Sequence, residues 1–249
     1  YTVKDADGDL KSTTLTIDVA NVTGTPTPTT GGQVSESGLA ANAATGTFDG
    51  TATGTGTNVL TGQALNLAAG WTAQAQTGSG TYGTFTVNAN GTYSYTLTQR
   101  TQDGAGVETD SFSYTAKDAN GNSVINTVTI TIVDDVPVAA VDTGSVTEGA
   151  LLTKTAAQGV LSNDKSGADG WESTGAVVGV VKGSNTSVDT QAGVNTAILG
   201  QYGTLTLQAD GSYTYKANAD AITSNVQDIF TYTVKDADGD LKSTTLTID

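Results

Sequence analysis

The chain has 249 residues, of which 25 are acidic and 10 are basic, so its net charge is −15. This excess of negative charge argues against nucleic acid and anionic membranes as partners, because both carry negative charge themselves. Neither His nor Cys occurs, which excludes disulfides and catalytic sites of the Ser-His-Asp and Cys-His kinds, and argues against zinc or copper. Oxygen ligands remain, and they favour calcium. We therefore predict a protein that is not an enzyme.

A perfect internal repeat sets the organisation of the chain. The sequence YTVKDADGDLKSTTLTID fills residues 1–18 and recurs without change at 232–249, an offset of 231 residues (232 − 1). A repeat at a fixed offset is typical of tandem arrays, so we interpret the chain as one unit of such an array. Because it contains no Met, we expect it to be a piece of a longer protein; no targeting or transmembrane segment is visible.

Residues 1–18 are the first predicted element, and they match the last two strands of a repeat whose remainder is missing. A two-stranded hairpin by itself is only marginally stable in water. We therefore expect residues 1–18 to pair with a neighbouring chain or to be held by lattice-like packing.

The rest of the chain divides into two similar halves, residues 19–134 and 135–249. GTFTVNANGTYSYTL (83–97) resembles GTLTLQADGSYTYKA (203–217), and both alternate Thr with Val, Leu, Phe or Tyr in the period of two that predicts half-buried strands. The Asn-Gly or Asp-Gly between the paired runs is typical of a hairpin turn. Without any helical periodicity, the pattern predicts an all-β fold of tandem immunoglobulin-like or cadherin-like sandwiches. Residues 39–81 are too weakly patterned for their strands to be assigned.

Three acidic turns are the first candidates for metal binding. They place oxygen-bearing side chains at alternate positions around a glycine, as the opening of an EF-hand loop does, but no Glu follows at the twelfth position. Like charges at this spacing repel, and either a bound calcium ion or solvation as an Asx-rich turn would offset the repulsion. The candidate ligands are Asp5, Asp7 and Asp9 in the first copy, Asp118 and Asn120 in the milder middle turn, and Asp236, Asp238 and Asp240 in the last.

Between the two halves, the junction IVDDVPVAAVD carries further carboxylates. Asp134, Asp135 and Asp142 flank a Pro, and Glu148 follows a little later. Ligands from two domains can share one ion only where the domains meet, so calcium here would turn a hinge into a rigid joint. The alternative is a charged linker that resists aggregation.

Beyond this junction, the stretch GVLSNDKSGADGW (159–171) offers Asn163, Asp164 and Asp169 across a turn that contains glycine. A calcium site and a plain loop are equally compatible with it. The first half has no acidic counterpart, because VLTGQALNLAAGW (59–71) carries none of these acids.

The linker after residues 1–18 is poorer in acid than the junction between the halves. Asn21 and Val22 stand where the internal junction has Asp134 and Asp135, and the surrounding residues are rich in Thr, Pro and Gly. Such a composition predicts a softer connection. We therefore expect unequal stiffness along the array, with the joint at 134–142 the firmer one.

Several of these stretches resemble known bacterial repeats. GTLTLQADGSYTYKA followed by DIFTYTVKDADGD resembles the VCBS repeat. VDDVPVAAVD, VTEGALL and GVLSNDKSGADG resemble the repeats of large type I-secreted, RTX-type biofilm adhesins of Gram-negative bacteria. The resemblance covers most of both halves and is weakest at 39–81. It implies immunoglobulin-like or cadherin-like sandwiches that form an extender between a membrane-proximal anchor and an adhesive tip.

The resemblance also implies that calcium at turns and junctions stiffens the array outside the cell. That role passes to Asp134, Asp135, Asp142, Glu148 and the two DADGD turns. The first half departs from the pattern at Asn120, at Asn122 and in residues 59–71.

The function expected from the sequence is therefore a structural extender of a bacterial surface adhesin, with neighbouring repeats and Ca²⁺ as its partners. One alternative is an adhesive module that binds a glycan or another ligand. Another is a filament subunit that assembles by strand exchange through residues 1–18. The perfect repeat favours the extender, because an array selected for length tolerates copies, whereas a binding tip needs only one.

Overall fold

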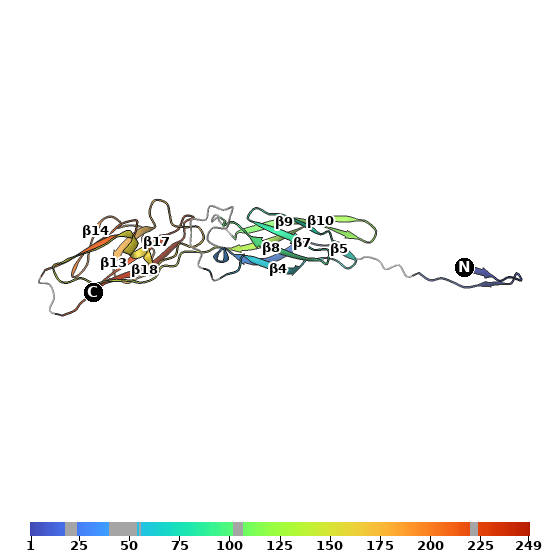
Figure 1. The fold of residues 1–249 in the computed structure, drawn as a ribbon, viewed down its shortest axis with the longest axis horizontal. Coiled ribbons are helices and arrows are strands. Elements are labelled where there is room, and N and C mark those ends of the chain that lie inside the picture. The colour runs from blue at the N-terminus through green and yellow to red at the C-terminus, as the bar shows by residue number, and fades with distance from the viewer. Residues whose placement is uncertain (18–23, 40–53, 55, 102–106, 220–223) are drawn as a thin grey trace.

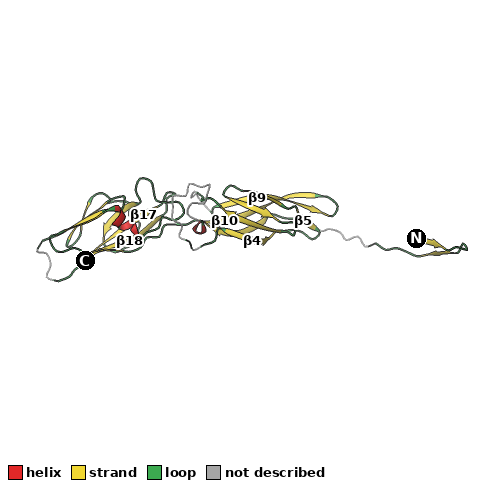
Figure 2. Ribbon diagram, viewed as in Figure 1, coloured by secondary structure: helices red, strands yellow, loops and turns green. Residues whose placement is uncertain are grey.

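The computed structural model describes residues 1–17, 24–39, 54, 56–101, 107–219 and 224–249. These residues form β-strands and three short 3₁₀ turns. Figure 2 colours the strands yellow and the 3₁₀ turns red. The predicted all-β fold of tandem sandwiches is confirmed. Two sandwiches lie end to end, and the N-terminal hairpin extends beyond them (Figure 1). No helix among the described residues is long and apolar enough to cross a membrane.

The first sandwich consists of two four-stranded sheets with the strand orders β3-β10-β9-β5 and β4-β8-β7-β6. The strands are β3 (Thr29–Ser35), β4 (Val59–Ala64), β5 (Trp71–Ala73), β6 (Gln76–Ser79), β7 (Gly83–Val87), β8 (Thr92–Leu97), β9 (Thr109–Asp118) and β10 (Ser123–Val133). A single 3₁₀ turn, η1 (Glu36–Gly38), follows β3. The region that the sequence pattern left unassigned thus supplies β4, β5 and β6.

The second sandwich repeats this arrangement with the strand orders β11-β18-β17-β13 and β12-β16-β15-β14. Its strands are β11 (Asp142–Gly144), β12 (Leu151–Lys154), β13 (Val177–Lys182), β14 (Ala197–Leu199), β15 (Gly203–Leu207), β16 (Tyr213–Ala217), β17 (Asp228–Lys235) and β18 (Leu241–Ile248). Two 3₁₀ turns, η2 (Ala156–Gln158) and η3 (Val160–Ser162), follow β12. Each strand occupies the place of its counterpart in the first sandwich, so the internal similarity of the sequence is a similarity of topology.

The predicted Asn-Gly and Asp-Gly hairpins are confirmed. They join β7 to β8 and β15 to β16. Gly91 and Gly211 both have φ of +83°, a conformation that glycine adopts without the steric cost of a Cβ. In β8, alternate residues are buried, and Tyr93, Tyr95 and Leu97 therefore all enter the core of the first sandwich.

Each sandwich has a parallel pair formed by its first and last strands. β3 pairs parallel with β10, and β11 pairs parallel with β18. Because the first and last strands run in the same direction, the chain enters a sandwich at one end and leaves it at the other. Sandwiches of this kind follow one another end to end, which gives the elongated arrangement of Figure 1.

The N-terminal hairpin, β1 (Thr2–Lys4) with β2 (Leu10–Ser12), has a very different environment from its identical copy in β17 and β18. Leu15 is 71% exposed, whereas Leu246, the same residue in the repeat, is completely buried. Among the described residues, every side chain from 1 to 17 is exposed. That a neighbouring chain or lattice packing covers this hairpin stays a prediction.

Candidate metal site

The parallel pairing of β3 with β10 places two carboxylates at one end of the first sandwich. Ser35 pairs with Val133 in this ladder, so the next residues, Glu36 and Asp134, leave the sheet at the same end. Glu36 begins η1 and is completely buried. Asp134 begins the link to the second sandwich, so both acids face the junction.

The second sandwich brings its own carboxylates to this junction. A bridge pairs Trp171 with Asp236, and the Ala237 N–H donates to the carbonyl of Gly170 at 2.9 Å. These contacts hold the loop that contains Asp169 against the acidic turn between β17 and β18. As a result, carboxylate oxygens of Glu36, Asp134 and Asp169 all lie within 4.8 Å of one another.

We call the acids at this junction the joint cluster. Its members come from the first sandwich, the connecting segment and the second sandwich. They are close enough to interact electrostatically: Asp134 interacts with Asp238 and Asp240, and Glu36 interacts with Asp135 and Asp238. The joint cluster consists of Glu36, Asp134, Asp135, Asp169, Asp236, Asp238 and Asp240. Its ligand types are carboxylates alone, the donor set that hard cations such as Ca²⁺ prefer.

Hydrogen bonds orient the cluster but do not use all of its oxygens. Glu36 Oε1 accepts from the Thr101 N–H and, at 2.7 Å, from Thr101 Oγ1. Asp236 Oδ1 accepts from the N–H groups of Gly239 and Asp240 at 3.0 and 2.7 Å. By contrast, Glu36 Oε2, Asp236 Oδ2 and Asp238 Oδ1 are buried and have no hydrogen-bond partner in the described part of the chain. Buried oxygens of this kind fit a cation, since an unsatisfied buried acceptor is costly.

Burial and mutual repulsion both act on the protonation of the cluster. Burial raises the pKa of Asp134, and the neighbouring Asp240 and Asp238 raise it further. Burial also raises the pKa of Asp236, and Asp238 adds to the effect. The pKa of Glu36 is raised by burial against the opposing hydrogen bonds from Thr101. Either protons or a cation must therefore offset the negative charge at the junction.

The sequence pattern identified most members of the joint cluster, and the structure brings them together. Asp134, Asp135, Asp169 and the last DADGD turn, all candidates from the sequence, meet at one place. Glu36 was not among the candidates. Its alignment with Glu148 was the available signal, but the parallel pairing that brings Glu36 beside Asp134 is not visible in the sequence.

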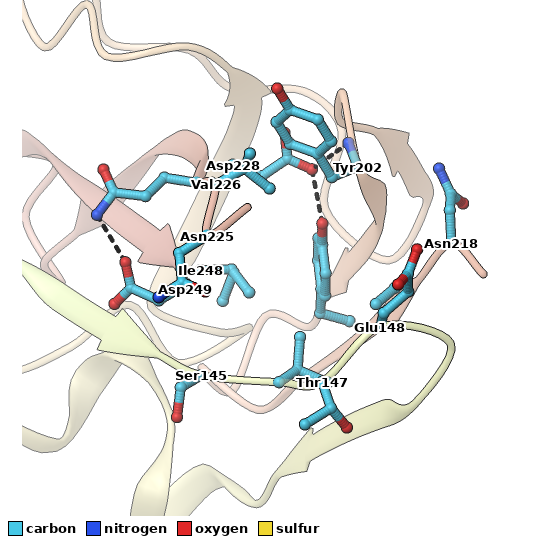
Figure 3. A pocket seen from close by; sticks show the side chains of 14 residues that line it. Ser145, Thr147, Glu148, Tyr202, Asn218, Asn225, Val226, Asp228, Ile248 and Asp249 are labelled. Carbon is cyan, nitrogen blue, oxygen red and sulfur yellow. Dashed lines mark hydrogen bonds between the residues drawn. The ribbon is translucent and has the colours of Figure 1, made fainter. Parts of the chain in front are cut away.

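The structure places Glu148 away from the joint cluster, although the sequence grouped it with Asp134. Figure 3 shows it lining a pocket with Tyr202, Asn218 and Asp249. This pocket lies where β18 ends, whereas the DADGD turn lies where β18 begins, and eight residues of strand separate them, or roughly 26 Å. Glu148 occupies in the second sandwich the place that Glu36 occupies in the first.

Asp142, Asn163 and Asp164 gather at a third place, inside the second sandwich. The hydroxyl of Tyr232 lies 2.7 Å from Asp142 Oδ2 and 3.1 Å from Asp164 Oδ2. Asp164 Oδ1 accepts from the Ala140 N–H at 2.7 Å, and Asn163 Nδ2 donates to the carbonyl of Val141. These side chains therefore fasten the connecting segment to β17 rather than facing the first sandwich.

The two remaining candidate turns are exposed. In the middle turn, Asp118 accepts from the N–H groups of Asn120 and Asn122 and from the Asn122 side chain, so its oxygens are used within the turn. In the N-terminal hairpin, carboxylate oxygens of Asp5, Asp7 and Asp9 lie within 4.8 Å of one another, and all three residues are exposed. Both turns have the Asx-type geometry that needs no ion.

Comparison with known proteins supports the fold. Residues 134–249 match the family described as the bacterial cadherin-like domain. No curated protein matches the chain. The chain is therefore an all-β protein of tandem cadherin-like sandwiches.

Three solved structures illustrate how distant the similar proteins are. Domains EC1-4 of Drosophila N-cadherin are 18% identical over 72% of this chain and 40% of that chain, with a TM-score of 0.31. Domains EC1-3 of the same protein are 12% identical over 90% and 63%, with a TM-score of 0.34. An endo-fucoidan hydrolase of glycoside hydrolase family 107 is 16% identical over 72% and 27%, with a TM-score of 0.26. The chain thus spans less than two thirds of each of them.

Proposed function

We propose that this chain is a non-enzymatic, extracellular spacer in which Ca²⁺ bound by the joint cluster locks two cadherin-like sandwiches end to end. The observation that carries the proposal is the set of buried, unpartnered oxygens of Glu36, Asp236 and Asp238. Glu36 belongs to the first sandwich and the other two to the second. An ion that they share links the two sandwiches directly.

The charge balance supports the same function. The cluster holds seven carboxylates, and a divalent ion with six to eight oxygen ligands would offset their repulsion without protonation. When bound, Ca²⁺ supplies only electrostatic attraction and ligation. The protein supplies orientation, through Thr101 for Glu36 and through the backbone of the DADGD turn for Asp236.

The internal repeat provides a matched test of calcium binding. Asp238 and Asp7 have identical neighbours in sequence, but Asp238 Oδ1 is buried in the joint cluster and Asp7 is exposed in the hairpin. With one site, the unmodified chain should gain about 2.7 kcal/mol in calcium at a hundredfold excess over Kd. We expect Asp238→Asn to lose most of this gain and Asp7→Asn to keep it, as measured by thermal unfolding in calcium and in chelator.

The same experiment can contradict the proposal in two ways. A melting temperature of the unmodified chain that does not change on adding millimolar calcium would remove the ion from the joint. Equal losses in Asp238→Asn and Asp7→Asn would show that sequence, rather than placement at the joint, determines binding.

The wider context belongs to the same proposal. An elongated, calcium-locked pair of sandwiches suits the extender of a bacterial surface adhesin that displays an adhesive tip in a biofilm, as the resemblance to type I-secreted adhesins implies. Calcium is abundant outside cells, so the joint would be locked there. Binding of the whole chain to a glycan array would instead favour the adhesive module.

A second function, assembly by strand exchange, is favoured by the exposure of the N-terminal hairpin. Tyr1, Val3 and Leu15 are exposed, whereas their copies Tyr232, Val234 and Leu246 are buried. The hairpin therefore carries the side chains that fill the core of a second sandwich. Analytical ultracentrifugation over a range of concentrations tests this: a chain that stays monomeric at high concentration excludes assembly through residues 1–17.

A further inference from the structure

One basic side chain crosses the joint. Arg100 follows β8 in the first sandwich, and its Nη1 donates to the backbone carbonyl of Asp169 in the second. The same nitrogen lies 3.4 Å from Asp169 Oδ1, and the Asp169 side chain is only 1% exposed. The ion pair between Lys235 and Glu172, by contrast, has both of its partners in the second sandwich.

The position of Arg100 relates it directly to the joint cluster. Its partner Asp169 lies within 4.8 Å of Glu36 and Asp134. The next residue, Thr101, holds Glu36 through its N–H and its hydroxyl. Residues 100 and 101 thus contact a carboxylate of each sandwich. Arg100 places its positive charge beside Asp169 of the second sandwich, and Thr101 donates two hydrogen bonds to Glu36 of the first.

The corresponding position in the second sandwich has the opposite charge. Aligning Tyr95 with Tyr215 places Arg100 opposite Asp220. The cation is therefore specific to the end of the first sandwich, where the carboxylates gather, and is not a general feature of the repeated fold.

We propose that Arg100 is a resident cation that holds the joint when calcium is scarce and sets the calcium concentration at which the joint locks. This inference rests on the proposed calcium site. Without the ion, the guanidinium neutralises part of the cluster and connects the sandwiches through Asp169. With the ion, its positive charge remains nearby and weakens calcium binding, since two cations repel. Arg100 is thus a positioning residue with a second, opposing effect on affinity.

The sign of the effect on affinity separates this role from a purely structural one. Arg100→Gln keeps a hydrogen-bond donor for the Asp169 carbonyl but removes the charge. We expect it to raise calcium affinity about tenfold, as one unit charge a few ångströms from the ion implies even in a high dielectric. Isothermal titration calorimetry of the full chain measures this. Arg100→Lys, which retains the charge, should keep the original affinity.

The two Arg100 variants should also differ in the stiffness of the joint when calcium is absent. The chain has no Cys, so spin labels at Thr86→Cys and Thr186→Cys, one on each sandwich, can report the distance between them. In chelator we expect Arg100→Gln to broaden the distance distribution and Arg100→Lys to leave it narrow. Lys216→Gln is the control for loss of one positive charge far from the joint, since Lys216 contacts Gly149 at the opposite end, and it should change neither measurement.

The calcium affinity and the distance distribution together decide between the inference and the proposed function. Higher affinity with a broader distribution in Arg100→Gln supports the inference. Unchanged or lower affinity in that variant, while the unmodified chain binds calcium, overturns the inference and leaves the proposed function intact. An unmodified chain that binds no calcium overturns the proposed function itself.

Discussion

At the scale of single residues, one buried carboxylate fixes the same corner of each sandwich. Asp110 is the second residue of β9 and is 3% exposed, and its counterpart Asp228 is the first residue of β17. Each accepts from a buried Tyr hydroxyl, at 2.7 Å from Tyr95 and 2.6 Å from Tyr215. Each also accepts from backbone N–H groups at a tight turn, between β6 and β7 for Asp110 and between β14 and β15 for Asp228. These bonds connect the two sheets of each sandwich.

The hydrogen bonds outweigh burial in setting the charge of these groups. Burial acts to raise the pKa of Asp110, but the Tyr95 hydroxyl and the backbone N–H groups lower it, and the result is a pKa below its ordinary value. The pKa of Asp228 is lowered in the same way, against burial, by Tyr215 and the backbone. Both groups are therefore ionised in the folded protein at neutral pH.

We expect Asp110→Asn to destabilise the first sandwich by about 3 kcal/mol at pH 7, because an amide nitrogen would face backbone donors and leave them unsatisfied. The pKa of Asp110 in the folded protein lies below its unfolded value of about 3.9. The stability that Asp110 provides relative to Asn is therefore fully present above about pH 3.9, and it is lost as the pH falls through the folded pKa. Urea unfolding at pH 7 and pH 3 measures the difference. A difference that persists unchanged at pH 3 would contradict the mechanism, and the exposed Asp210→Asn should cost about 1 kcal/mol or less at both.

At the scale of elements, the strands that could be predicted are those whose signal is local. The alternation in residues 83–97 and 203–217 and the turn at Asn90-Gly91 specify a hairpin without reference to the rest of the chain. β4, β5 and β6 could not be assigned, because Gly and Thr dominate there and tertiary pairing decides the structure. The site follows the same rule: the acidic turns are local, but Glu36 reaches Asp134 only through parallel pairing of distant strands.

The identical copies of the last hairpin allow burial to be tested without changing the local sequence. We expect Leu246→Ala in β18 to cost about 2 to 5 kcal/mol, since it leaves a cavity in the core. Leu15→Ala, the same substitution in the exposed copy, should change stability by about 0.5 kcal/mol or less. Chemical unfolding of both variants at low protein concentration is the measurement. A large cost for Leu15→Ala would mean that a partner covers residues 1–17.

At the scale of the whole molecule, the two joints of the repeating unit differ in composition. The joint cluster draws carboxylates from the connecting segment and from the second sandwich. At the other joint, Asp236 has an acidic counterpart, Asp118, but the remaining positions do not. Asn21 and Val22 replace Asp134 and Asp135, and Ala69 replaces Asp169 when Trp71 is aligned with Trp171. Asn120 and Asn122 replace Asp238 and Asp240. The expectation of unequal stiffness therefore extends to calcium dependence.

We expect calcium to narrow the distance distribution between labels on the two sandwiches and to leave unchanged the distribution between the N-terminal hairpin and the first sandwich. Spin labels at Thr86→Cys with Thr186→Cys, and at Lys11→Cys with Thr86→Cys, distinguish the two joints. The physical reason is that, within the described parts of the chain, the carboxylates buried at a joint lie between the two sandwiches, whereas Asp5, Asp7 and Asp9 in the hairpin are exposed. Equal narrowing at both joints would contradict the prediction.

The parallel pairing of first and last strands also determines how the molecule carries mechanical load. Tension applied to the two ends of the chain pulls β3 against β10, and β11 against β18, in opposite directions along their lengths. The hydrogen bonds of each ladder lie across that direction. The force therefore loads them together in shear, and they do not break one after another. Under tension, the chain would thus extend first at the connections between sandwiches, where no such ladder bears the force.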